Sequence, residues 1–183
     1  MSRILAALRH HDHRLTRRIA AWDHPWIRTV LPTAQNAAEH TALWWAAAVV
    51  MASAGGRRGR NAAGAGLAAM GLAEALSNTV GKQLVERRRP PKEWIPNAEV
   101  EERPTSSSFP SGHTAAAIAF ATTVTVVWPA AGAVCAAPAL AVAVGRVHSG
   151  AHYPTDIAAG TAIGLASTAL VLTARHRATQ RWR

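Results

Sequence analysis

A histidine and an aspartate near the C-terminal end of the chain are spaced for nucleophilic chemistry. His152 and Asp156 are four positions apart, so at the start of a helix they face the same way. A carboxylate placed there can accept a hydrogen bond from one imidazole nitrogen, which fixes the tautomer and leaves the other nitrogen free to attack. The spacing therefore predicts that Asp156 orients His152 as a nucleophile.

A second segment, Phe109-Pro-Ser-Gly-His-Thr114, is expected to open a helix. Ser111 is a good N-cap, and the free N–H groups of Gly112 and His113 would then point outward, where a helix N-terminus binds phosphate. Gly112 permits close approach of the backbone to a ligand, and His113 is placed to donate a proton. In isolation, an ordinary capped helix with a histidine at the membrane interface would show the same residues.

Three cations accompany these segments. Lys82 and Arg89 are seven positions apart, close to two helical turns, so on a helix both would project from one face. Arg146 precedes His152 and can bind phosphate oxygens through two parallel hydrogen bonds. A basic cluster that ends a transmembrane helix is more often a headgroup anchor, so only the combination of cations and imidazoles predicts a phosphate site.

Apolar helices must position these residues. Residues 111–145 contain no Lys, Arg, Asp or Glu, which corresponds to about 50 Å of helix, more than one bilayer core of ~30 Å. Trp128-Pro129 lies near the middle, and proline disfavours helix at the preceding residue, so the run predicts a helical hairpin that crosses the membrane twice. The alternative is a buried hairpin in a soluble protein, which the charged fraction of only 16% disfavours.

Further apolar runs complete the predicted fold, an all-α integral-membrane helical bundle of about five transmembrane helices. Small residues dominate these runs, as they do in closely packed transmembrane helices. The runs are residues 41–56, 61–81 and 156–174. We expect a transmembrane core that carries the candidate phosphate site over 41–175 and a basic tail over 176–183.

Residues 1–40 differ from the core and are predicted to form basic amphipathic helices on the membrane surface, broken at Trp22–Pro25. One helical face is apolar and the arginines lie largely elsewhere; the apolar face comprises Ile4, Leu8, Leu15, Ile19, Trp22 and Trp26. A flexible basic tail is the alternative.

The charge and the cysteine content exclude other classes of protein. The net charge of +10 could indicate nucleic acid, but the basic residues form short clusters between apolar runs, which anionic lipid headgroups explain better. The single cysteine, Cys135, lies in an apolar run, so there is neither a disulfide framework nor a cysteine metal site, and a small buried hydrophobe is expected.

Ten positions in these segments resemble the three signatures of the type 2 phosphatidic acid phosphatase superfamily, which also contains vanadium haloperoxidases and bacterial acid phosphatases. The signatures appear in order as Lys82 to Pro90 (Lys, six residues, Arg-Pro), Pro110 to His113 (Pro-Ser-Gly-His) and Arg146 to Asp156 (Arg, five residues, His, three residues, Asp). The resemblance covers about residues 75–165.

One position departs from the family pattern. Gly145 stands where the family usually has a serine, whose hydroxyl adds a phosphate contact. We expect His148, Ser149 or a backbone N–H to substitute for it, with reduced contacts to the transition state and no loss of activity.

The resemblance implies a mechanism without a metal or other cofactor. His152 attacks phosphorus and forms a phosphohistidine, Asp156 orients it, and His113 protonates the leaving oxygen and then activates water. Fixed donors neutralise the phosphoryl oxygens; they are Lys82, Arg89, Ser111, Gly112 and Arg146. Asp156 is the one acid among the ten matched positions, so the motifs contain no carboxylate cluster for Mg²⁺.

The expected partners are a lipid phosphate substrate and the bilayer, not nucleic acid. The resemblance favours a prenyl phosphate or diphosphate in a bacterial plasma membrane; phosphatidate, phosphatidylglycerophosphate and a decaprenyl-phosphoribose phosphate are alternatives. A haloperoxidase and a non-catalytic lipid scrambler or scaffold are rival interpretations, and the retention of His113, His152 and Asp156 argues against the scrambler and the scaffold. The oligomeric state and the side of the membrane that holds the site are not predicted.

Overall fold

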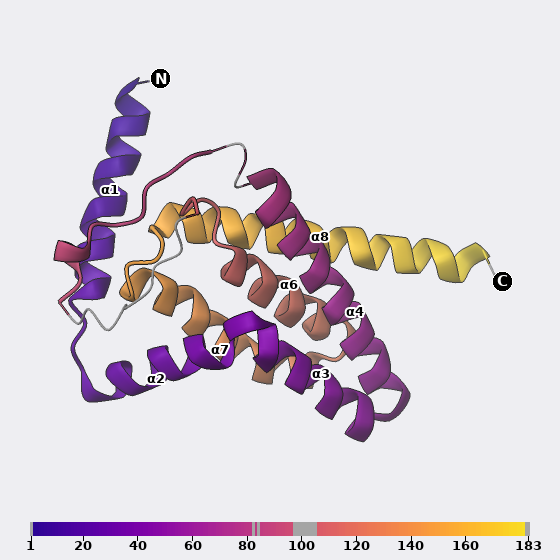
Figure 1. Cartoon of the computed structure of the whole chain (residues 1–183). Coiled ribbons are helices and arrows are strands. Elements are labelled where there is room, and N and C mark those ends of the chain that lie inside the picture. Colours follow the sequence, from indigo (N-terminus) through magenta and orange to yellow (C-terminus); the bar gives the residue numbers. More distant parts are fainter. Residues whose placement is uncertain (1, 82, 84, 97–105, 182–183) are drawn as a thin grey trace.

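The computed structural model of this chain describes residues 2–81, 83, 85–96 and 106–181. Within these ranges the protein has seven α-helices and no strand (Figure 1), which agrees with the all-α prediction. The helices are α1 (Ser2–Ala20), α2 (Pro25–Ala37), α3 (Ala42–Ala54), α4 (Gly56–Ala75), α6 (Gly112–Val127), α7 (Pro129–His148) and α8 (Pro154–Arg181). Short 3-10 turns at Glu39–Thr41 and Lys92–Trp94 and a π-helical turn at Leu76–Gly81 complete them.

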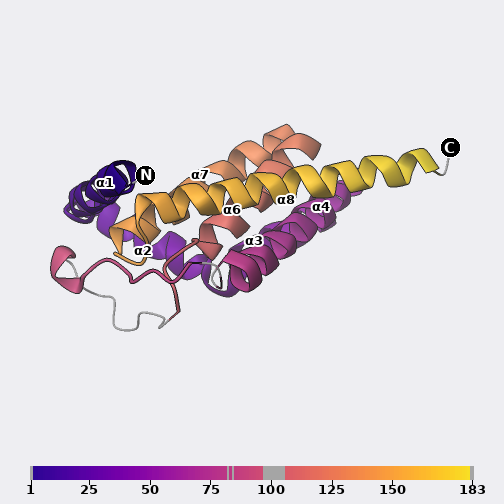
Figure 2. The ribbon, with the colours of Figure 1, turned by 90° about the horizontal axis from the view of Figure 1, so that it is seen from above.

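Helix α6 is the centre of the bundle. It packs against α4, α7 and α8 (Figures 1 and 2), and its alanines and Phe120 are almost wholly buried. Because most of its contact residues are small, the neighbouring helices approach its backbone closely. The first residue of α6, Gly112, thus lies at one end of a tightly packed core.

Two glycines bring α8 against the start of α6. A Cβ atom added at Gly160 would lie 2.5 Å from the carbonyl oxygen of Ser111, and one added at Gly164 would lie 2.7 Å from the carbonyl oxygen of Ala115. Only residues without a side chain permit this approach. The first turn of α8, which carries Asp156, is therefore held beside the N-terminus of α6.

The helical hairpin predicted over residues 111–145 is confirmed, while its two crossings of the membrane stay a prediction. Helix α6 ends at Val127 and α7 begins at Pro129, with Trp128 alone between them. The proline stands at the first position of α7, where its missing N–H has no helical partner to lose. Cys135, as predicted, is buried within α7.

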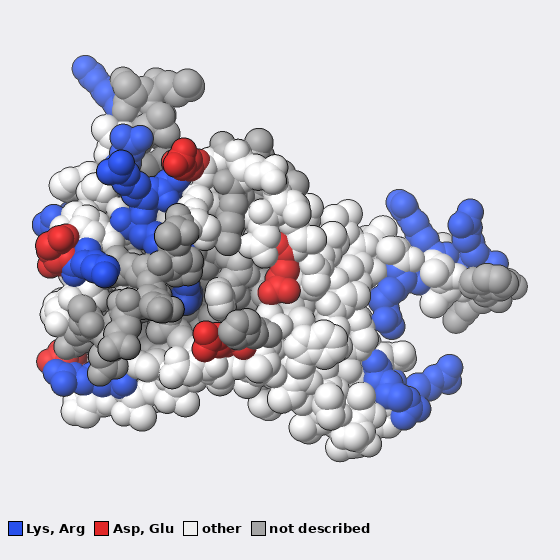
Figure 3. Space-filling view, in the orientation of Figure 1, with Lys and Arg blue, Asp and Glu red and all other residues white. Residues whose placement is uncertain are grey.

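The features of α7 and α8 support an integral membrane protein. By length and composition both are able to cross a membrane, whereas α3 and α6 are apolar but have 13 and 16 residues. Large apolar side chains point outward from α7 and α8, among them Val134, Leu140 and Leu170. On the face that Figure 3 shows, Lys and Arg gather toward two opposite ends of the molecule, and most of the surface between them is uncharged apart from a few acidic side chains. This distribution suits a chain that spans a bilayer.

The N-terminal segment forms two helices separated by residues 21–24, as predicted. The apolar face of α1 is turned outward, since Leu8 and Leu15 are exposed, as is Trp22 just after the helix. The face that meets the protein holds Asp12 and Thr16, both buried, against α7 and α8. Helix α1 is thus docked through polar side chains and offers its apolar side to the surroundings.

Candidate active site

His152 lies in the turn between α7 and α8 and is 3% exposed. Its Nδ1 atom is 2.6 Å from the carbonyl oxygen of Ser108. Because a carbonyl oxygen only accepts hydrogen bonds, this contact places the proton on Nδ1 in the neutral ring. The Nε2 atom then keeps its lone pair, which is the form that a nucleophilic imidazole needs.

The predicted hydrogen bond between His152 and Asp156 is absent, and this interpretation was wrong in its detail. The distance from Nδ1 to the nearer carboxylate oxygen, Oδ2, is 3.9 Å, too long for a hydrogen bond. Asp156 instead accepts from the backbone N–H of Tyr153 at 2.8 Å and from Nη1 of Arg87 at 2.6 Å. Its carboxylate therefore holds the turn that carries His152, while a backbone carbonyl orients the ring.

The three signature segments meet at one end of the bundle. Nη1 of Arg89 donates to the carbonyl oxygen of Ala151 at 2.7 Å, next to His152. The backbone N–H of Ser111 donates to the carbonyl oxygen of Asp156 at 3.1 Å. The first and second segments thus both contact the third, so the structure brings together residues that are far apart in the sequence.

The expected helical face shared by Lys82 and Arg89 does not form. The π-helical turn ends at Gly81, and residues 85–91 have no helix. The pair Pro90-Pro91 explains this, because proline disfavours helix at the residue before it and cannot continue one. Lys82 itself lies outside the described residues.

Positive charge surrounds His152. Burial lowers the pKa of this imidazole well below its usual value, and the nearby guanidinium groups of Arg146 and Arg89 lower it further. A positive charge on His113 acts in the same direction, while the bond to Ser108 opposes it. His152 is therefore neutral at physiological pH, and both arginines and His113 lie near enough to influence it.

The start of α6 has the cap that the sequence predicts. Ser111 is the N-cap: its hydroxyl accepts from the N–H of Thr114 at 3.4 Å and lies 2.9 Å from the Thr114 hydroxyl. A Cβ added at Gly112 would meet Asn78 Oδ1 at 3.7 Å and Ser77 Cβ at 3.9 Å, which are ordinary contacts. The described protein atoms themselves thus do not require a glycine here.

Arg146 presents an unsatisfied donor. Its Nε atom is buried, and among the residues described it has no hydrogen-bond partner. Buried polar atoms without partners are rare in folded proteins and call for an explanation. An anion bound beside His152 would supply one.

The space beside Gly145, which a serine side chain would need, is occupied by a side chain of α2. A Cβ there would lie 3.0 to 3.2 Å from side-chain atoms of Gln35 on α2. Ser149 donates to Oε1 of Gln35 at 3.2 Å, and Nε2 of His148 lies 3.0 Å from the carbonyl oxygen of Trp22. The two side chains that were expected to substitute for the serine thus form hydrogen bonds elsewhere, which leaves a backbone N–H as the remaining expected substitute.

Two residues of the site were missed by the sequence reasoning. Arg87 bridges the carboxylates of Asp156 and Asp12, with 2.6 Å to each. Three consecutive arginines occupy positions 87–89, and nothing in the sequence distinguished the first. A signal did exist for Asp12, because it is the one acid in the basic helix α1.

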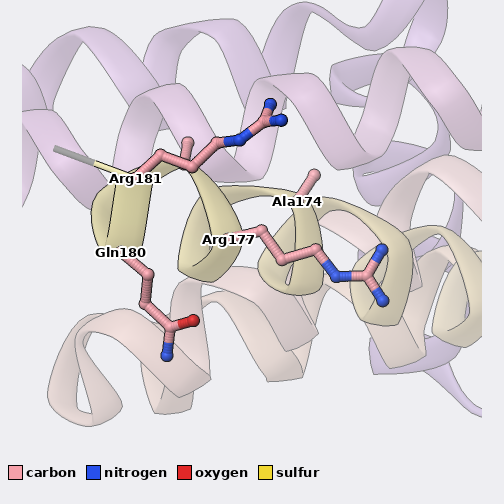
Figure 4. Close-up of a pocket in the computed structure, with 5 residues that line it drawn as sticks. Ala174, Arg177, Gln180 and Arg181 are labelled. Carbon is pink, nitrogen blue, oxygen red and sulfur yellow. The ribbon is translucent and has the colours of Figure 1, made fainter.

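No group of three His, Cys, Asp or Glu side chains able to hold a metal occurs in the described part of the chain. The absence of a metal from the reaction stays a prediction. A surface hollow along the last turns of α8 is lined by Ala174, Arg177, Ala178, Gln180 and Arg181 (Figure 4). Asp156 lies in the first turn of the same helix, at its opposite end. The hollow contains none of the predicted site residues.

Comparisons with solved structures agree with the observed fold. Among solved structures, the chain is similar to a transmembrane PAP2-type phosphatidylglycerolphosphate phosphatase from Bacillus subtilis, with a TM-score of 0.67, 22% identity, and coverage of 93% of this chain and 87% of the other. It is also similar to LpxE from Aquifex aeolicus, with a TM-score of 0.65, 21% identity, and coverage of 87% and 93%. At such identities the likeness shows the fold. A search of curated protein sequences found no match.

A comparison of the sequence with models of protein families identifies the family of this chain. The model of the PAP2 superfamily matches residues 62–180, which is more than half of the chain and includes all ten signature positions. The resemblance noted from the motifs is thereby confirmed. This chain belongs to the PAP2 superfamily and is a phosphatase.

Proposed function

We propose that this protein removes phosphate from a phosphomonoester or diphosphate of a membrane lipid through a covalent phosphohistidine on His152. The observation that carries the proposal is the environment of this ring: a buried, neutral imidazole with Nε2 unprotonated and two arginines nearby. A neutral nucleophile attacks phosphorus, and the surrounding cations stabilise the charge that develops on the phosphoryl oxygens.

Arg146 and Arg89 are proposed to hold the phosphoryl group. The buried Nε of Arg146, which lacks a partner among the described residues, would donate to a phosphoryl oxygen. Arg89 is anchored to the carbonyl oxygen of Ala151 through Nη1, which fixes its guanidinium beside the turn of His152. Lys82 is proposed as a further phosphate ligand on the family pattern alone.

The N-terminus of α6 is proposed to complete the phosphate cradle. Its first N–H groups have no helical partners. A Cβ added at Gly112 would approach described protein atoms no closer than 3.7 Å, so the space beside this residue can accept a ligand. The hydroxyl of Ser111 contacts Thr114, so its own contribution to phosphate binding would need a second hydrogen bond. His113, the next residue of α6, is proposed as the acid that protonates the leaving oxygen and then activates water.

A lipid substrate is supported by the membrane character of the bundle. Helices α7 and α8 can cross a bilayer, and their ends meet at His152, so the site lies where a phosphate headgroup would be while the lipid tail stays in the membrane. We propose five spans in a bacterial plasma membrane, with α3, α4 and α6 as the remaining three.

A prenyl phosphate or diphosphate is our first choice of substrate, and a glycerophospholipid phosphate is the second. The similar fold of the Bacillus subtilis protein, described as a phosphatidylglycerolphosphate phosphatase, favours testing the second class in parallel. A panel of short and long prenyl phosphates, prenyl diphosphates, phosphatidate and phosphatidylglycerophosphate, compared by kcat/KM, distinguishes the two.

The decisive test uses purified protein in detergent and the best substrate of that panel. We expect phosphate release that His152→Ala abolishes and that His176→Ala, a change at an exposed histidine near the end of α8, leaves intact. Quenching with a ³²P-labelled substrate should trap an acid-labile label on the wild-type protein and none on the His152 variant. Phosphate release that persists in His152→Ala would refute the mechanism.

A further inference from the structure

The N-terminal helix contributes a buried carboxylate to the site. Asp12 of α1 is 3% exposed. Its Oδ1 accepts from the backbone N–H of Thr155 at 3.0 Å, and its Oδ2 accepts from the Thr155 hydroxyl at 2.5 Å and from Nη2 of Arg87 at 2.6 Å. One side chain on α1 therefore binds both the first turn of α8 and the segment before α6.

Arg87 carries this contact onward to Asp156. Its Nη1 donates to Oδ1 of Asp156 at 2.6 Å and to the Thr155 hydroxyl at 2.7 Å, and the guanidinium lies 4.1 Å from the centre of the Tyr153 ring. Two buried carboxylates thus share one cation. A charge buried in this way is tolerated only when its partners are in place, so loss of one member strains the others.

A short series of hydrogen bonds connects the guanidinium of Arg87 to the turn that carries His152. Oδ2 of Asp156 holds the N–H of Tyr153, the residue that follows His152. Thr155, which Asp12 holds by two hydrogen bonds, belongs to the same turn. A shift of Arg87 or Thr155 would therefore displace the backbone of His152 relative to Ser108 and the arginines.

A simple anchoring role for α1 does not require this arrangement. Helix α1 is already held by the stacking of Arg17 on Trp94, at 4.3 Å from the ring centre, and by the edge contact of His13 with the same ring, at 4.8 Å. Its one acidic side chain is buried instead against the turn that carries the proposed nucleophile.

We infer that Asp12 is a positioning residue, which acts through Arg87 and Thr155 to keep Asp156 and the turn of His152 in the geometry for attack. The inference rests on the proposed function in that it takes His152 as the nucleophile. It assigns to α1 an indirect part in the reaction.

The first test compares Asp12→Asn with Asp23→Asn. The second variant removes the charge from an exposed ion pair with Arg28, between α1 and α2, and is the matched control. We expect Asp12→Asn to lower kcat by about tenfold or more, as a small misplacement of reacting groups does, with KM within about twofold of wild type. Asp23→Asn should keep both constants.

A double-variant cycle tests the route through Arg87. Arg87→Gln alone should lower kcat, and Asp12→Asn added to it should cost less than it does in the wild-type protein, because the shared cation is already lost and only the contacts with Thr155 remain to be lost. Wild-type kcat in Asp12→Asn overturns the inference, and so does a double variant in which the two losses multiply.

A spectroscopic measurement separates this inference from the proposed function. In protein labelled with ¹⁵N at histidine, with the His152 signals assigned by His152→Gln, we expect Asp12→Asn to shift the ring-nitrogen resonances of His152 and Asp23→Asn to leave them in place. No substrate is needed. If the wild-type protein releases no phosphate that depends on His152, the proposed function fails; unchanged ring signals in Asp12→Asn refute the positioning role.

Discussion

The close approach of α8 to α6 makes Gly160→Ala the most informative single change. A Cβ at this position would lie 2.5 Å from the carbonyl oxygen of Ser111 and 3.3 Å from the backbone nitrogen of Ala115. Ordinary carbon–oxygen contacts are no shorter than about 3.3 Å, so the two helices must separate by roughly 0.8 Å. Both of these neighbours are backbone atoms, which cannot rotate away as a side chain can.

This displacement would lengthen the backbone hydrogen bond that joins the second and third signature segments. The distance from Ser111 N to Asp156 O is 3.1 Å, and the same shift would lengthen it to roughly 3.9 Å, beyond hydrogen-bonding range. Overpacking of this kind costs about 1–3 kcal/mol of stability. Misplacement of reacting groups by about 1 Å costs about 100-fold in rate, so kcat should fall far more than the folded fraction.

Gly71→Ala on α4 is the matched control. Apart from the adjacent residues and backbone of its own helix, no described atom lies within 4 Å of a Cβ at that position. An alanine inside a helix is more favourable than glycine by about 0.5–1 kcal/mol. Thermal unfolding in detergent and phosphate release at a temperature where both variants are folded are the assays. A Gly160→Ala protein as active and as stable as Gly71→Ala would refute the account of the α6–α8 contact.

Three further predictions follow from the site. Gly112→Ala should fold normally, because the added Cβ meets protein atoms at 3.7 Å or more, yet lose about 100-fold or more in kcat/KM by obstructing phosphate; an unchanged kcat/KM would exclude Gly112 from the cradle. In a pH profile of kcat/KM, the plateau should extend below about pH 6.5, the ordinary pKa of histidine, because burial and the arginines lower the pKa of His152 and it is protonated only as the pH falls through that lower value; an acid limb centred at or above 6.5 would contradict this. Gly145→Ser should destabilise the protein by about 1 kcal/mol through contact with Gln35, and Gln35→Ala in the same chain should restore the loss; equal unfolding midpoints for the single and double variants would count against the contact.

Features that depend on neighbouring residues were predictable. The break at Trp128-Pro129 follows from the stereochemistry of proline, and the N-cap at Ser111 follows from the ability of its hydroxyl to accept from Thr114 N. The spacing of four residues also predicted that the side chains of His152 and Asp156 lie near each other, and Nδ1 of His152 is 3.9 Å from Oδ2 of Asp156. These are local effects, and a single sequence contains all the information that they need.

Partners distant in the chain were not predictable in the same way. Asp12 and Arg87 are separated by 75 positions, and no periodicity relates them. The oxygen that orients His152 belongs to the backbone of Ser108, and since every residue has such a carbonyl, the sequence cannot single it out.

The amphipathic pattern of α1 shows the same division. The sequence alone determined that α1 has an apolar and a polar face, because side-chain types and helical geometry suffice for that. Which face meets the protein was decided by the tertiary structure: Leu8 and Leu15 point outward, while Asp12 is buried. The physical reason is that Asp12 can be buried only where Arg87 and the N-terminus of α8 together satisfy its charge, and that meeting place exists only once the bundle has formed.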